Sequence, residues 1–123
     1  MPGWNKDNRL RHNREYRVVY RVGKSVANKD IVLYFARNRQ SNVRAGFSVS
    51  KKIGKSVVRN RVRRLIKEVF RLHINDIKPG YDLIFIARTG NKSLKYDDME
   101  RAVLDVLKRA GLYIDKKNRV DEI

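Results

Sequence analysis

The chain has 123 residues, a length that suits one domain with one modest hydrophobic core. Its 30 Lys and Arg residues against 13 Asp and Glu residues give a formal net charge of +17, and the resulting self-repulsion favours a polyanionic partner such as nucleic acid. Because the chain has no cysteine, disulfides, cysteine-based zinc fingers and thiol catalysis are excluded. It has neither an apolar run of roughly 20 residues nor an apolar N-terminal signal, so we expect a cytoplasmic protein without membrane contact.

The first predicted helix covers about residues 14–22, with Asn13 as its N-cap and Gly23 as a left-handed residue that ends it. Its apolar stripe contains Val18, Val19 and Val22. Tyr16 and Tyr20 lie four residues apart at the edge of that stripe, so we expect them to stack side by side and to be half exposed.

Two segments that follow have the alternation of strands. Residues 30–37 (DIVLYFAR) and 43–50 (VRAGFSVS) each place apolar side chains on one face. Since only the polar loop 38–42 separates them, we expect the two strands to pair as a hairpin.

From Ser56 to about His73 the apolar period becomes helical, and one stripe falls within an arc of roughly 120°. The stripe contains Val58, Val62, Leu65, Ile66, Val69 and Leu72. The opposite face is cationic and is interrupted mainly by Glu68 and Phe70; it contains Arg59, Asn60, Arg61, Arg63, Arg64, Lys67 and Arg71. A helix face that is only solvated usually pairs opposite charges four residues apart, and this face does not. The arginine guanidinium can donate two parallel hydrogen bonds to phosphate oxygens. The face therefore favours nucleic acid as a partner.

The rest of the chain predicts one more strand and one more helix. Residues 81–88 (YDLIFIAR) are nearly continuously apolar, as in a central strand covered on both faces. The last helix begins near Asp97, Asp98 and Glu100, which suit a helix N-terminus, and ends at Gly111. The order helix, strand, strand, helix, strand, helix predicts an α+β sandwich with helices packed on one small sheet.

The loop before the cationic helix is basic as well, with Lys51, Lys52 and Lys55. Gly54 in this loop has two interpretations: it brings backbone close to an anionic ligand, or it only makes a turn. The motifs GFSVSKK (46–52), Gly54-Lys55 and RNRVRR (59–64) resemble the RNR signature of bacterial ribonuclease P proteins. The resemblance extends over residues 9–113, including Arg9-Leu10, Ser25 to Asn28, Val32 to Tyr34, Pro79 to Asp82 and Ile86 to Arg88.

The resemblance implies a small mixed sheet with about three helices, a left-handed strand-helix-strand crossover, and a fold like that of the second domain of a small-subunit ribosomal protein. The resemblance also implies the protein component of ribonuclease P, which binds the catalytic RNA and the 5′ leader of precursor tRNA and assists endonucleolytic removal of that leader. Charge and apolar spacing divide the chain into a basic flexible arm (1–12), a single RNA-binding domain (13–114) and a polar tail (115–123).

The resemblance assigns these contacts to two sets of residues. The residues implied to bind the catalytic RNA are Lys51, Lys52, Lys55, Arg59, Asn60, Arg61, Arg63, Arg64 and Lys67. The residues implied to hold the leader, in a cleft between the first helix and the sheet, are Tyr16, Tyr20, Tyr34, Ser48 and Ser50. The family often has phenylalanine at the first two of these tyrosine positions and lysine at the position of Arg63.

The resemblance implies an accessory subunit, one monomer per RNA, without catalytic residues, a metal site or a tightly bound cofactor of its own. The chemistry would belong to magnesium ions held by the RNA. Two alternatives stay open: a ribosomal or RNA-chaperone protein, and a protein-only nuclease that uses His12, His73 and carboxylates.

Overall fold

A mixed sheet with helices on both faces is built by residues 6–88 and 94–114, the part of the chain that the computed structural model describes. The α-helices are α1 (Asn13–Val22), α2 (Ser56–His73) and α3 (Tyr96–Arg109). The strands are β1 (Lys24–Ala27), β2 (Ile31–Arg37), β3 (Arg44–Ser48) and β4 (Tyr81–Ala87). Short 3-10 turns are η1 (Lys6–Asn8), η2 (Lys51–Ile53) and η3 (Ile74–Asp76). The α+β class is confirmed.

The sheet has the strand order β1-β2-β4-β3, in which β4 pairs antiparallel with β2 and parallel with β3. The prediction of a central strand for β4 is confirmed. The predicted hairpin between β2 and β3 is wrong, because β4 lies between them. Buried Asp82 at the start of β4 accepts hydrogen bonds from Arg44 on β3 and from Asn38 after β2, which helps to hold β4 in this place.

The strand β1 was not predicted, and it forms one edge of the sheet. Its register pairs Lys24 with Phe35 and Ala27 with Val32. Only Val26 of its four residues is partly buried. A short edge strand with so little apolar surface lacks the alternation by which strands are found in a sequence.

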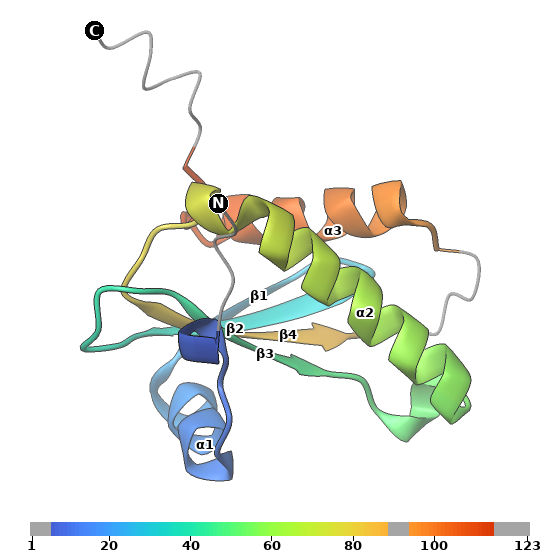
Figure 1. The fold of residues 1–123 in the computed structure, drawn as a ribbon, viewed down its shortest axis with the longest axis horizontal. Coiled ribbons are helices and arrows are strands. Elements are labelled where there is room, and N and C mark those ends of the chain that lie inside the picture. The colour runs from blue at the N-terminus through green and yellow to red at the C-terminus, as the bar shows by residue number, and fades with distance from the viewer. Residues whose placement is uncertain (1–5, 89–93, 115–123) are drawn as a thin grey trace, which may run out of the picture.

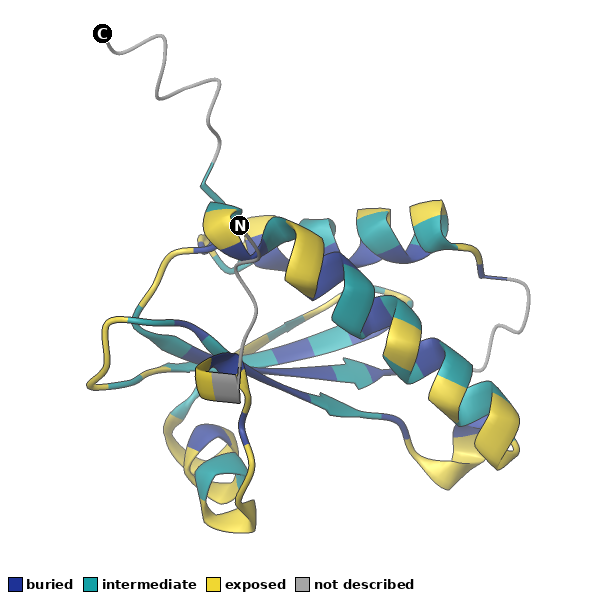
Figure 2. Cartoon of the chain, viewed as in Figure 1, coloured by how far each residue is buried: buried dark blue, intermediate teal, exposed yellow. Residues whose placement is uncertain are grey.

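Helices α2 and α3 cover one face of the sheet and α1 lies on the other (Figure 1). The main core lies between the sheet and α2 and α3, and contains Phe70, Phe85 and Leu107. A smaller cluster under α1 contains Leu10, Val19 and Ile84. Figure 2 shows that α1 leaves most of its surface exposed, so one face of the sheet is only partly covered.

The helix bounds predicted for α2 are confirmed, but its buried stripe is rotated from the predicted one. Phe70 is fully buried, whereas Leu72 is 54% exposed. The Phe70 ring packs against Phe47 and Phe85 of the sheet, with ring centroids 5.9 and 6.1 Å away. Because α2 also packs against α3, two neighbours decide which side chains are buried, and a single stripe on a helical wheel does not describe both.

The ends of α1 differ from the prediction. His12, not Asn13, is the N-cap, and Gly23 has an extended backbone with φ −80° in place of the predicted left-handed one. Glycine is needed at position 23 because of close packing: a Cβ there would lie 2.4 Å from the Val19 carbonyl oxygen and 2.7 Å from that of Phe35. Of the predicted valine stripe only Val19 is buried, since α1 contacts the sheet along a narrow line.

Residues 6–12, within the predicted arm, run beside β3. The Leu10 amide donates a hydrogen bond to the Ala45 carbonyl at 3.0 Å, and Leu10 is only 3% exposed. The Asn8 side chain donates to the Val43 carbonyl at 2.8 Å. The free edge of β3 is therefore partly covered by this segment. The rest of the predicted arm (1–5) and the predicted tail (115–123) lie outside the described residues.

Candidate nucleic-acid interface

The loop between β3 and α2 presents three lysines to solvent. Buried Ile53 anchors η2 to the core, while Lys51, Lys52 and Lys55 around it are exposed. The helix that follows has no acidic residue in its first turn, and no side chain of the described residues caps its N-terminus. Free amides and the positive end of the helix dipole therefore add to the charge of the lysines, which makes this end of α2 attractive to anions.

Gly54 is explained by the turn alone. Its φ of 151° lies in a region that disfavours side chains, so glycine is needed here whether or not a ligand binds. Arg59 Nε donates a hydrogen bond to the Gly54 carbonyl at 3.2 Å, which holds the loop against the first turn of α2.

The face of α2 turned away from the core carries most of the predicted cationic residues. Asn60 and Arg64 are exposed, and Arg59 and Arg63 are partly exposed. Arg63 Nη1 donates to Asn60 Oδ1 at 2.9 Å, which orders two side chains of this face. Farther along, Arg71 pairs with Glu68, which lowers the pKa of Glu68, so the positive charge is concentrated in the first half of the helix.

Two predicted residues lie at the flanks of this face. Arg61 Nη2 donates to the Leu94 carbonyl at 2.5 Å, so its guanidinium is directed toward the chain that enters α3. Lys67 lies on the other side, with Nζ 6.0 Å from the centre of the Phe47 ring. Burial lowers the pKa of Lys67, and the nearby charges of Arg9 and Arg63 lower it further.

The tyrosine face, defined as Tyr16, Tyr20, Tyr34 and Ser48, lies on the α1 side of the sheet. Tyr20 and Tyr34 meet edge to face, with ring centroids 5.0 Å apart and an interplanar angle of 80°. The predicted stack of Tyr16 on Tyr20 is wrong, because Tyr20 turns toward β2 and Tyr16 toward β3. Burial raises the pKa of both side chains, in agreement with their partial exposure.

The sheet register places Ser48, Ile86 and Val32 side by side across three strands. All three are partly exposed, and they continue the tyrosine face beyond α1. Ser50 is exposed past the end of β3, where its carbonyl accepts a hydrogen bond from the Ile53 amide. It therefore lies between the tyrosine face and the loop lysines.

Gly46 lets α1 approach β3 closely. A Cβ on Gly46 would lie 2.3 Å from the Tyr16 hydroxyl oxygen and 2.5 Å from Cζ of its ring. The position of Tyr16 thus depends on the absence of a side chain on the strand beneath it.

A charged network holds the N-terminal end of α1 to the sheet. Arg44 binds Asp82 through two hydrogen bonds of 2.8 and 2.6 Å, and it binds Glu15 at 3.0 Å. Burial acts to raise the pKa of Glu15, but the amides of His12 and Arg11 and the charge of Arg44 hold that pKa below its ordinary value.

This geometry has close counterparts among known proteins. The family model Ribonuclease P matches residues 4–111. The chain belongs to the ribonuclease P protein family. The ribonuclease P protein component of Clostridium botulinum (strain 657 / Type Ba4) is 55% identical over 109 residues, covering 88% of this chain and 98% of that relative. The component of Clostridioides difficile (strain 630) is 46% identical over 112 residues, covering 90% and 98%.

Solved ribonuclease P proteins share the fold. The Staphylococcus aureus protein aligns with a TM-score of 0.80 at 36% identity, covering 86% of this chain and 97% of that one. The Thermotoga maritima protein aligns with a TM-score of 0.76 at 30% identity, covering 82% and 96%. As a member of this family the chain is a protein component of ribonuclease P, a tRNA-processing endoribonuclease, and its partner is the ribonuclease P RNA.

In this ribonuclease P protein the structure adds Arg9 to the predicted interface. A small hollow of about 130 Å³ at the free edge of β3 is lined by Arg9, Tyr16, Arg63 and Lys67 among others. No carboxylate from residues 6–88 or 94–114 lines it, and it connects the tyrosine face with the cationic face of α2. Arg9 was assigned to the arm because the sequence has no pattern that reveals the pairing of residues 8–10 with β3.

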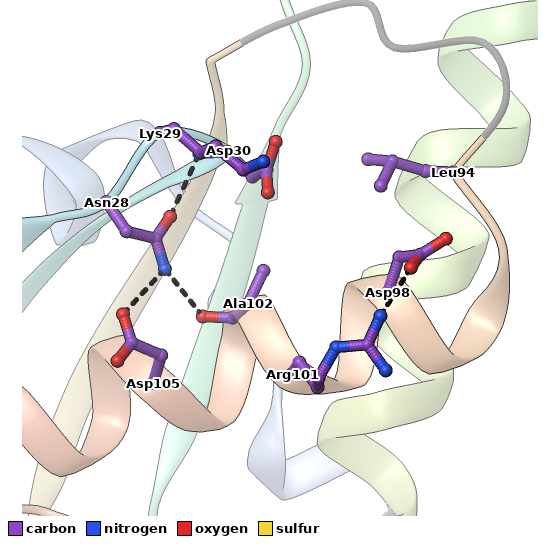
Figure 3. Close-up of a pocket in the computed structure, with 8 residues that line it drawn as sticks. All are labelled: Asn28, Lys29, Asp30, Leu94, Asp98, Arg101, Ala102 and Asp105. Carbon is purple, nitrogen blue, oxygen red and sulfur yellow. Dashed lines mark hydrogen bonds and ion pairs between the residues drawn. The ribbon is translucent and has the colours of Figure 1, made fainter.

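A larger hollow of about 500 Å³ lies elsewhere, between the β1–β2 turn and α3 (Figure 3). Its charged lining is mixed: Asp30, Asp98 and Asp105 outnumber Lys29 and Arg101, and Arg101 pairs with Asp98, so the hollow offers phosphate no excess of positive charge. Asn28 in its wall donates hydrogen bonds to the Ala102 carbonyl and to Asp105, so its role is to fasten the turn to α3. We do not assign this hollow to the interface.

The residues of the alternative nuclease hypothesis are not brought together. His12 is exposed at the start of α1, whereas His73 at the end of α2 binds Glu100 through Nε2 at 2.7 Å, and the two helices cover opposite faces of the sheet. Among the described residues there is no cluster of three or more potential metal ligands. No helix in residues 6–88 and 94–114 is both long and apolar enough to cross a membrane.

Proposed function

We propose that this protein binds the catalytic RNA of ribonuclease P through the loop lysines and the cationic face of α2, and binds the 5′ leader of precursor tRNA on the tyrosine face. Hydrolysis is assigned to the RNA subunit and its magnesium ions, and this chain increases the affinity for substrate. One protein monomer serves one RNA. The protein acts in the cytoplasm.

The observation that carries the proposal is the adjacency of two surfaces of different chemistry. The first is rich in cations and poor in carboxylates, as expected for contact with a phosphate backbone. The second offers the paired rings of Tyr20 and Tyr34 and the partly exposed row Ser48, Ile86 and Val32, which suits unpaired bases, because every base has a face that can stack. A single RNA strand could follow both surfaces across the edge of β3.

The test is 5′ maturation of a precursor tRNA at near-physiological magnesium, with a bacterial ribonuclease P RNA, with this protein, and with both. We expect efficient cleavage only with both components. Cleavage by the protein alone would establish the nuclease alternative. Tight RNA binding without any stimulation of cleavage would instead favour the ribosomal or chaperone alternative.

The division of labour is tested with Tyr34→Ala. We expect it to weaken holoenzyme binding of precursor tRNA by roughly tenfold, as expected for the loss of about 1–3 kcal/mol of base stacking. Binding of mature tRNA, which has no leader, should be unchanged. Equal losses for both substrates would contradict the assignment of the tyrosine face to the leader, and Tyr34→Phe serves as the control that retains the ring.

A further inference from the structure

Another hollow lies at a corner of the sheet, where α1 ends and β1 begins. Its volume is about 410 Å³, within the range of roughly 300–1,000 Å³ that is usual for ligand pockets. Val22, Lys24, Ala36, Arg37 and Tyr81 contribute to its walls.

The strand register explains why this corner is open. The first pair between β1 and β2 joins Lys24 to Phe35, so Ala36 and Arg37 continue past the end of β1. Gly23 adds no side chain to fill the gap, and it cannot be replaced by a larger residue, because backbone oxygens of Val19 and Phe35 crowd its Cβ position. The hollow therefore results from the way Gly23 joins α1 to β1 without a side chain.

The hollow combines apolar surface with positive charge. Val22 is 62% exposed and gives the hollow its apolar surface. The Arg37 guanidinium lies 5.6 Å from the centre of the Tyr81 ring, so a flat cation and an aromatic ring form one wall. Within the described part of the chain no carboxylate lines this hollow, unlike the hollow next to Glu15 or the one in Figure 3.

We propose that this corner hollow binds one unpaired nucleotide of RNA. At the sheet edge beyond the end of β1, its base would lie between Val22 and Ala36, which lie on the α1 side, and the Arg37–Tyr81 pair, which belongs to the other face of the sheet. Its phosphate would be bound by Lys24 and Arg37. Arginine stacks on bases and binds phosphate. The cations of the hollow therefore complement the negative charge of a nucleotide's phosphate, and the apolar surface beside them complements its base. The inference rests on the proposed RNA binding for the source of the ligand.

The corner hollow is distinct from the tyrosine face. The register forms three neighbouring cross-strand rows on this face of the sheet. The middle row contains Tyr34 and Ile84. Ala36, Asp82 and Arg44 form the row on one side of it, and Val32, Ile86 and Ser48 form the row on the other side. Since α1 lies over the row between, through Val19 on Ile84, the helix separates Ala36 from the end of the tyrosine face at Val32, Ile86 and Ser48. Phe35 and Tyr81, which also line the hollow, pack toward the main core on the other face of the sheet. An RNA segment in the hollow is therefore not the segment that would occupy the tyrosine face.

The test is a titration of the isotope-labelled protein with a short single-stranded oligouridylate, followed by amide resonances in NMR spectra. Gly23 and Ala36 report on the corner hollow, and Val32 and Ser48 report on the tyrosine face. We expect saturable shifts in both sets. Shifts at Val32 and Ser48 alone would overturn the inference and leave the proposed function standing, whereas shifts in neither set would contradict both.

Variants distinguish specific binding in the corner hollow from nonspecific electrostatic attraction of RNA to a basic protein. Lys24→Ala with Arg37→Ala should weaken the response of Gly23 and Ala36 by roughly fivefold or more. The slope of log affinity against log salt should also become shallower, by about 1 for each phosphate that the variant no longer binds. The matched control, Lys95→Ala with Lys108→Ala on the α3 side, removes the same charge and should leave that response unchanged. An equal decrease in the control would overturn the proposal.

A third variant tests stacking. Arg37→Lys retains the charge but loses the planar guanidinium, so it should weaken the response at the corner hollow while Val32 and Ser48 titrate as before. Unchanged affinity in Arg37→Lys would contradict the stacked arrangement. Retained dispersion of the spectrum shows in each case that the variant is folded.

Discussion

Single atoms decide the shape of the tyrosine face. Tyr16 reaches its place only because Gly46 has no Cβ, since an added carbon would overlap its ring. In the same way Gly23 is needed for close approach of backbone and not for a left-handed turn. The sequence shows that both positions are glycine, but it does not show which close contact requires a residue without a side chain.

Gly46→Ala is expected to displace Tyr16 and to move the start of α1 away from β3. We expect a loss of stability of about 1–3 kcal/mol, typical of overpacking, measured by urea denaturation. Leader-dependent binding of precursor tRNA should fall as well. The double variant with Tyr16→Ala provides the control: it should recover part of the stability, because the clash is then removed.

Glu15 links stability to pH. Its pKa lies below its ordinary value of 4.5 in the folded protein, so its charge stabilises the fold above that value, and this contribution is lost as the pH falls through the folded pKa. Glu15→Gln should therefore cost about 1 kcal/mol at pH 7. The difference from the wild type should vanish in strong acid. A difference that is independent of pH would show that the charge of Glu15 contributes nothing to stability.

At the scale of elements, α2 divides its cations between two tasks. Arg64 is exposed, whereas Arg61 donates to the Leu94 carbonyl beside α3. Both were predicted to bind the catalytic RNA, since both belong to the RNRVRR motif that resembles the family's signature. The neighbouring helix distinguishes them, because the chain entering α3 supplies an acceptor to Arg61.

Arg64→Ala should weaken binding of the ribonuclease P RNA and leave the free energy of unfolding within about 0.5 kcal/mol of the wild type. Arg61→Ala should in addition destabilise the protein by about 1 kcal/mol, because a hydrogen bond between two elements is removed. RNA affinity and urea denaturation of the two variants provide the comparison. If Arg61→Ala changes affinity alone, its bond to Leu94 has no structural role.

The whole molecule combines a net charge of +17 with an uneven distribution of acids. Among the described residues, carboxylates are absent from the first turn of α2 and from the hollow that joins α2 to the tyrosine face. In the hollow beside α3, three carboxylates outnumber the two cations Lys29 and Arg101. The protein is therefore expected to present one side to RNA and to keep the α3 side away from it.

Binding to the ribonuclease P RNA should weaken steeply with salt, since each phosphate contact releases counterions. The logarithm of affinity should fall linearly with the logarithm of salt concentration, and removal of one contacting side chain should reduce the slope by about 1. Filter binding or fluorescence anisotropy across a salt series measures this slope. A flat response would contradict electrostatic binding, and Lys108→Ala on the α3 side should leave the slope unchanged.

Local patterns were sufficient for the long elements and for the chemistry of the interface. The bounds of α2, the central position of β4 and the clustering of lysine and arginine before and along α2 all follow from periodicity and composition, because these features need only neighbouring residues. The motifs of residues 46–64 were sufficient for the family.

Pairing and orientation required the tertiary structure. Strand β1 and the separation of β2 from β3 by β4 depend on contacts between distant residues, such as Arg44 with Asp82, that no local pattern contains. The same holds for Arg9 beside Lys67, for Tyr20 against Tyr34 in place of Tyr16, and for the burial of Phe70. The sequence thus determined which chemistry this protein carries, and only the packing of the sheet against its three helices decided which side chains act together.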